Sequence, residues 1–181
     1  VNGFSTGAFN PDALALGGVV ASRTVAASAM SAGPQSYSCS PSIGTLVFQG
    51  TTGATPGAYS AYPTNIPGIG VRISLTNCLP FGYWPGTESY GAQTSQTMTP
   101  TCLYMVELIK TGAITSGGSL SGEFGGVFGQ GGGPGTQIVS LRFSSDVLVT
   151  PTVPTCAPAI PNQVVPLGQV AAQVVTAAGT T

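Results

Sequence analysis

The chain is 181 residues long and carries only four basic and five acidic residues, with no histidine, so its formal net charge is −1. Charged residues make up 5% of the chain, against about 25% in ordinary soluble domains, whereas hydrophobic residues still reach 42%. Four basic residues cannot supply the roughly six or more phosphate contacts of ordinary DNA binding. Without histidine, histidine-based catalytic triads and histidine-containing zinc sites are excluded. The composition indicates a neutral, loop-rich protein.

Alternating hydrophobic patterns predict short β-strands along much of the chain. No long window shows a helical stripe, and the nearest to one, Val20 to Met30, is also compatible with a strand. Val71 to Leu75 alternates apolar and polar side chains, and Gln137 to Ser145 does the same. Further strand candidates are the apolar runs Thr45–Phe48, Cys102–Ile109 and Val147–Val149. Many short strands separated by glycine and proline predict an all-β antiparallel sandwich or barrel, with Val71, Ile73, Leu75, Val139, Leu141 and Phe143 facing the core.

The chain changes character after Val149, which predicts a domain boundary. Three prolines stand between Thr150 and Pro158, and this spacing is typical of an extended, stiff linker. Beyond it, Val164 to Val170 has the pattern of an opening strand, but too few residues follow for a second core. We therefore expect one binding domain over 1–150, and a linker with the truncated start of another domain over 151–181. No apolar run reaches the ~18 residues of a membrane span.

The four cysteines favour disulfides in an exported protein over a zinc site, because none has CxxC spacing. Cys78 ends one of the two strongest predicted strands and Cys102 begins the other, so a bridge between them would close the base of the intervening segment. Cys39 and Cys156 would pair either with each other or with residues outside this chain segment. No metal or cofactor is predicted.

The search for catalytic motifs is negative. Gly118 to Gly122 superficially has the form of a nucleophile elbow, but its central residue is leucine and no histidine can act as base. Gly129 to Gly135 matches neither the dinucleotide-binding nor the P-loop pattern, and a hairpin loop is the better interpretation. The five carboxylates are scattered along the sequence. We expect no enzymatic activity.

Aromatic residues concentrate between Cys78 and Cys102. Tyr83, Trp84, Glu88 and Tyr90 place three aromatic side chains and a carboxylate close together in a segment rich in glycine and proline. Aromatic faces with a neighbouring carboxylate are common in recognition surfaces, which predicts a receptor site with Tyr83 and Trp84 as the contact platform. The alternative, of equal weight, is that Trp84 folds back to cover the core.

Three stretches together resemble adhesins of chaperone–usher fimbriae, especially those of type 3 and type 1 fimbriae. Tyr62 to Ile73, Y-P-T-N-I-P-G-I-G-V-R-I, is similar to a family signature, although its Pro-Gly segment is also the sequence of a structural turn. Val106 to Ile114, followed by Gly117 to Gly122, resembles a strand pair of the family. Thr155-Cys156 and Val164 to Gly168 are similar to the linker and first strand of the following pilin domain.

The resemblance implies the receptor-binding domain of a fimbrial tip adhesin, located extracellularly at the tip of the fimbria. Its fold would be an elongated, jelly-roll-like variant of the immunoglobulin-like antiparallel β-sandwich. Its receptor would be a host carbohydrate or an extracellular-matrix protein, and fimbrial subunits and the periplasmic chaperone would bind the pilin domain. The family often pairs the cysteine at Cys39 with one near the mature N-terminus, which is absent here, and Cys156 would bridge to a cysteine beyond Thr181. A structural pilin-type subunit without a receptor of its own is the alternative.

Overall fold

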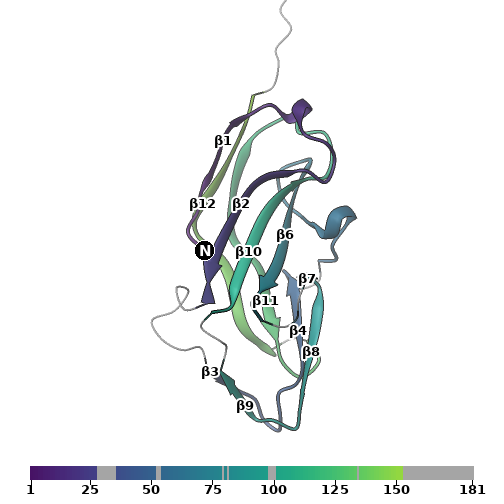
Figure 1. The fold of residues 1–181 in the computed structure, drawn as a ribbon, viewed down its shortest axis with the longest axis vertical. Helices are drawn as coiled ribbons and strands as arrows, with labels where there is room; N and C mark the ends of the chain where they lie inside the picture. The colour runs from purple at the N-terminus through teal and green to yellow at the C-terminus, as the bar shows by residue number, and fades with distance from the viewer. Residues whose placement is uncertain are drawn as a thin grey trace, which may run out of the picture.

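The computed structural model describes residues 1–27, 36–51, 54–78, 80, 82–97, 101–133 and 135–152 (Figure 1). Its strands are β1 (Ser5–Phe9), β2 (Val19–Ala26), β3 (Ser36–Ser38), β4 (Gly44–Gly50), β5 (Tyr62–Pro63), β6 (Ile69–Thr76), β7 (Gly82–Tyr83), β8 (Gly86–Gly91), β9 (Ser95–Thr97), β10 (Leu103–Lys110), β11 (Gly118–Phe128) and β12 (Gln137–Pro151). Two short 3₁₀ segments, η1 (Pro11–Ala13) and η3 (Ala58–Ser60), stand between strands. Within the described residues, no helix is long and apolar enough to span a membrane.

Two sheets face each other across the core in an elongated sandwich (Figure 1). Sheet A has the strand order β1-β12-β11-β4-β8, and sheet B has the order β2-β10-β6-β5 with β7 also pairing to β6. β3 and β9 form a separate two-stranded sheet. The predicted all-β sandwich is confirmed. One pairing differs from the antiparallel expectation, since β1 runs parallel to β12 along the edge of sheet A.

The paired strands β6 and β10 form the centre of sheet B. Ile73 lies opposite Val106 and Leu75 opposite Tyr104, and all four side chains are buried in the core. The alternation predicted for β6 is present, but its second face is not a solvated one. There Arg72 forms an ion pair with Glu107 at 2.8 Å, and both side chains are largely buried. Both faces of β6 are therefore covered.

Residue patterns alone predict no strand at the glycine-rich β11, because glycine is unfavourable in strand interiors, and only the family resemblance indicated a strand starting near Gly117. Here the absence of side chains makes room for the opposite sheet. A Cβ on Gly125 would lie 2.8 Å from Cδ1 of Ile73 and 3.4 Å from the ring of Trp84. Close approach of backbone and side chains, rather than flexibility, explains this glycine. β12 was predicted as two short strands and is one continuous strand of 15 residues.

Trp84 is a core residue, which corrects its predicted role as a contact platform. Its exposed fraction is 0%, and its indole packs edge-to-face against Phe48 and Tyr104 with ring centroids 5.7 and 6.2 Å apart. β7 and β8 flank this residue and direct its side chain between the sheets. A side chain without exposed surface cannot contact a receptor, so the alternative interpretation, in which Trp84 covers the core, is correct.

The predicted disulfide between Cys78 and Cys102 is present, with the two Cα atoms 5.3 Å apart. It joins the end of β6 to the residue that precedes β10. The segment between them is not an extended loop, since it contains β7, β8 and β9. The bridge therefore secures the start and end of a chain segment that contributes strands to all three sheets.

Cys39 is a free thiol beside Gly129. It directly follows β3, which lies at the end of the molecule opposite to the end of β12 (Figure 1). The 15 residues of β12 separate these two ends by about 50 Å. Cys156 lies outside the described residues. Both interpretations of these two cysteines, pairing with each other or with cysteines outside this chain segment, therefore stay predictions. The boundary at residue 151 is also untested, because residues 153–181 are not described.

Two leucines on β12 provide a matched test of this architecture. Leu141 is fully buried between the sheets, whereas Leu148 is 48% exposed. We expect Leu141→Ala to lower the free energy of unfolding by about 2–5 kcal/mol, because it leaves a cavity in the core. Leu148→Ala should change it by less than about 1 kcal/mol. Urea denaturation followed by circular dichroism measures both values, and equal losses would contradict the arrangement of the sheets.

Trp84 is tested in the same way. Trp84→Ala should cost about 3–5 kcal/mol of stability through the cavity left between Phe48 and Tyr104. Trp84→Phe should lose less than half as much, because a ring remains and the indole Nε1–H has no acceptor among the described residues. An unchanged melting temperature for Trp84→Ala would show that the residue is not part of the core.

Candidate functional site

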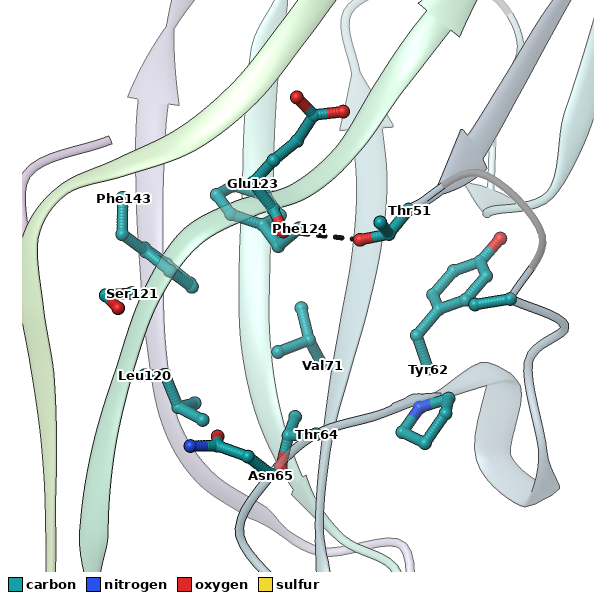
Figure 2. A pocket seen from close by; sticks show the side chains of 12 residues that line it. Thr51, Tyr62, Thr64, Asn65, Val71, Leu120, Ser121, Glu123, Phe124 and Phe143 are labelled. Atoms are coloured by element: carbon teal, nitrogen blue, oxygen red, sulfur yellow. Dashed lines mark hydrogen bonds between the residues drawn. The ribbon is translucent and has the colours of Figure 1, made fainter. Parts of the chain in front are cut away.

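A hollow opens between the two sheets on one side of the sandwich (Figure 2). It exists because β4 ends at Gly50, opposite Gly125, whereas β11 begins seven residues earlier, at Gly118. On this side, β11 therefore has no strand neighbour over its first half. The short strand β5 forms the facing edge of sheet B. The hollow has a volume of about 280 Å³, just below the ~300 Å³ that is usual for the smallest ligand pockets.

The floor of the hollow is apolar and comes from both sheets. Val71 of sheet B and Leu120, Phe124 and Phe143 of sheet A line it. The rings of Phe124 and Phe143 stack with centroids 4.3 Å apart, and Phe4 packs edge-to-face behind Phe143. These side chains are in contact with the main core, so the floor is rigid. An apolar group of a ligand would bind here by excluding water from these surfaces.

The wall on the side of sheet B consists of residues 62–65, which end in a tightly bonded turn. The hydroxyl of Thr64 donates to the carbonyl of Ile69 at 2.7 Å and accepts from the backbone N–H of Ile66 at 3.1 Å. Gly68 has φ of +79°, and a Cβ there would collide with the carbonyl of Ala113. The turn expected for the Pro-Gly sequence is present, and it holds the Tyr-Pro-Thr-Asn segment against the hollow.

Two hydrogen bonds border the hollow, one between the two walls and one within sheet A. The amide Nδ2 of Asn65 donates to the carbonyl of Ser119 at 3.2 Å. The hydroxyl of Thr51 donates to the carbonyl of Glu123 at 3.3 Å, as Figure 2 shows. Both carbonyls lie on the part of β11 that lacks a strand neighbour. Because side chains already bond these carbonyls, the free edge of β11 is a poor template for an added strand. The hollow is better suited to a single side chain or sugar group of a ligand.

No carboxylate points into the hollow from the residues drawn in Figure 2. The carboxylate of Glu123 extends away from it and accepts hydrogen bonds from Ser140 at 2.7 Å and Gln137 at 2.8 Å, with Arg142 at 3.4 Å. The bonds from Ser140 and Gln137 are the main cause that lowers the pKa of Glu123, and Arg142 adds to them. The interior of the hollow is therefore uncharged among its lining residues.

The residues predicted as a receptor site do not lie together. Tyr83 is 48% exposed on the outer side of sheet B, where the guanidinium of Arg72 lies 4.2 Å from its ring centroid. Glu88 and Tyr90 are half-buried on the edge strand β8, and Trp84 is in the core. Tyr90 is hydrogen-bonded to Tyr37. The pKa of Tyr37 is raised mainly by its burial and, to a smaller extent, by the nearby Tyr90.

Sequence reasoning missed the residues of the hollow. The Tyr-Pro-Thr-Asn segment was recognised only as part of a family signature and a turn, and Leu120 and Ser121 only as part of a family strand pair and a failed catalytic motif. The two stretches lie more than 50 residues apart, and only the arrangement of sheets brings them together. Among the residues that the structure describes, no group of histidine, cysteine and carboxylate side chains could hold a metal ion.

Comparison with known proteins agrees with this architecture. Residues 9–146 match the family model of the MrkD-like receptor binding domain. The structure is similar to the crystal structure of the receptor binding domain of the plasmid-born adhesin MrkD1P of Klebsiella pneumoniae, with a TM-score of 0.58 and 20% sequence identity. The similarity covers 87% of this chain and 96% of that one, whereas no curated protein sequence matches. This chain is therefore a member of the MrkD-like receptor-binding domain family of fimbrial adhesins.

Proposed function

We propose that this domain attaches the cell to a host or surface receptor by binding one uncharged group of that receptor in the hollow. The observation that carries the proposal is the combination of an apolar floor with rim side chains that already donate hydrogen bonds to backbone carbonyls of β11. A volume of about 280 Å³ suits a single sugar ring or one to two side chains rather than a long segment. The receptor is a glycan or a matrix protein.

The accounting of hydrogen bonds supports an uncharged receptor group. Thr64 uses its hydroxyl as donor and acceptor within the turn, and Thr51 and the Asn65 amide nitrogen donate to backbone carbonyls. The hydroxyl of Tyr62, which also lines the hollow, has no hydrogen-bond partner among the described residues, and it is an uncharged group. A charged group would lose its hydration without gaining an ionic partner, which is unfavourable in a dry site. Binding is thus non-covalent and driven mainly by apolar contact.

A second surface, the exposed ring of Tyr83, is kept as a candidate for the same receptor. One face of this ring lies on the guanidinium of Arg72, and Glu107 holds that guanidinium in place. A ring fixed from below loses little conformational freedom on binding, which favours affinity. Glu88 and Tyr90 of β8 stay candidates as polar neighbours, although they do not share the outer face of sheet B with Tyr83.

The chain beyond Thr152 would carry the domain at the tip of a fimbria outside the cell. In this proposal, residues 151–181 are the linker and the start of a pilin domain, which assembles with fimbrial subunits after delivery by the periplasmic chaperone. A structural subunit without a receptor of its own is the competing function. A purely structural role does not explain why an apolar hollow stays open at the side of the sandwich.

Blocking the hollow tests the proposal. A glycan array and a panel of matrix proteins identify the receptor, and surface plasmon resonance then measures affinity. Ser121 lines the hollow and is exposed, so Ser121→Trp should fill it and weaken binding at least about tenfold. Ser89→Trp on the edge strand β8 is the matched control and should leave affinity within about twofold. Equal affinities for both variants would show that the receptor binds elsewhere, and no receptor in either panel would favour the structural subunit.

Salt dependence gives an independent test of the uncharged site. Raising the ionic strength from about 0.05 to about 0.5 M should change the affinity by less than about twofold, because no ion pair forms on binding. Glu123→Gln should also leave affinity unchanged, since the carboxylate points away from the hollow. A steep loss of affinity with salt would mean that charged groups carry recognition.

A further inference from the structure

Thr152, the last described residue before the following chain, is bonded directly to strand β1. Its backbone N–H donates to the carbonyl of Phe9 at 2.7 Å, and its hydroxyl donates to the same carbonyl at 2.9 Å. Two residues earlier, the hydroxyl of Thr150 donates to the carbonyl of Gly7 at 2.6 Å. The end of β12 is therefore held by β1, which runs parallel to it toward the same end of the molecule (Figure 1).

β1 is in turn fastened to sheet B. After Phe9, residues 10–18 cross the end of the sandwich to β2. The ammonium group of Lys110, the last residue of β10, donates to the carbonyls of Pro11 at 2.7 Å and Leu14 at 2.8 Å. Backbone bonds join Lys110 to Gly17 at 2.8 Å and to Gly18 at 2.9 Å. One lysine thus binds both ends of the crossing to a central strand of sheet B.

Two mechanical connections therefore start from the end of β12. The first leads into sheet A through β11, where Val149 pairs with Gly118 and Leu148 with Ser119. The second leads through β1 and residues 10–18 into sheet B. The hollow has one wall on each sheet, with Leu120 and Phe124 on sheet A and Val71 on sheet B. Its shape persists only while the two sheets move together.

We propose that β1 and residues 10–18 form a load-sharing strap, with Lys110 as its fastening. The proposal rests on the function above, in which the receptor holds the hollow and the following chain pulls at Thr152. Tension along β12 loads its bonds to β11 and β1 at the same time. With β11 alone, the force would draw sheet A along sheet B and separate the walls of the hollow. With the strap, both sheets take up the tension.

Forced unfolding of single molecules tests the strap without any receptor. The domain is pulled between a tag after Thr181 and a cysteine handle, in a Cys39→Ser, Cys156→Ser background. The handle is either Ser22→Cys on β2 of sheet B or Ser89→Cys on β8 of sheet A, both exposed. Lys110→Met keeps the apolar stem and removes the two ammonium bonds.

The expected result depends on the direction of pulling. With the handle on sheet B, Lys110→Met should unfold about tenfold faster at constant force, and with the handle on sheet A less than about threefold faster. Arg23→Met, on the exposed face of neighbouring β2, removes one charge without these bonds and should have no effect in either direction. Equal acceleration in both directions would mean general destabilisation, and no acceleration would mean that the strap bears no load. Either outcome overturns the proposal.

The experiments distinguish a failure of the strap proposal from a failure of the proposed receptor site. Without load, Lys110→Met should bind the receptor as tightly as the parent domain, within about twofold, and under load its bond to the receptor should break sooner. If Ser121→Trp leaves binding intact, the site in the hollow is wrong while the forced-unfolding result still decides on the strap. If Lys110→Met already weakens binding without load, Lys110 shapes the hollow at rest and the proposed role is overturned.

Discussion

The difference in length between two neighbouring strands determines most of what this domain presents to a partner. β4 stops at Gly50, while β11 begins at Gly118 and runs past it. An unpaired strand edge beside an apolar core would ordinarily invite another strand. Here Thr51 and Asn65 bond the exposed carbonyls of β11, so the edge is satisfied and the floor behind it stays accessible. A side-chain group can enter where a strand cannot.

Glycine in β11 is the second condition for this arrangement. Gly125 lets Ile73 and Trp84 approach the backbone of sheet A, so a large aromatic core fits between the sheets below the hollow. Tyr104, Phe48 and Trp84 fill the core next to Gly125. The hollow lies beside them along β11, over Leu120 and Phe124. The rigidity of the site thus derives from packing next to it.

The fold class could be predicted from the sequence because alternation in β6 and β12 reports directly which side chains face the core. The disulfide followed from the position of Cys78 and Cys102 at the ends of two strong strands, and the structure contains it. Hydrophobic patterning does not predict β11, because its glycines act through contacts with the opposite sheet, which local propensity does not contain; only the family resemblance indicated a strand there. The role of Trp84 was ambiguous, since an aromatic residue in a segment rich in glycine and proline can lie in an exposed loop or pack into the core.

The hollow lay beyond sequence reasoning for a further reason. Its walls come from residues 62–65 and 118–124, whose proximity depends on the pairing of β5 with β6 and of β11 with β12. Each stretch has a sufficient local explanation, the first as a turn and the second as a glycine-rich strand. Neither pattern reports that a neighbouring strand ends early, and that ending creates the space.

The placement of the basic residues determines where trypsin-like proteases can cut this domain. Arg23, Arg72, Lys110 and Arg142 are the only sites in the chain after which a trypsin-like protease can cut. All four lie within strands, in β2, β6, β10 and β12, where the backbone is engaged in sheet hydrogen bonds. Cleavage requires an extended segment free to enter the enzyme, so a strand must first leave its sheet. The sandwich must therefore open at one of these four strands before a trypsin-like protease can cut the domain.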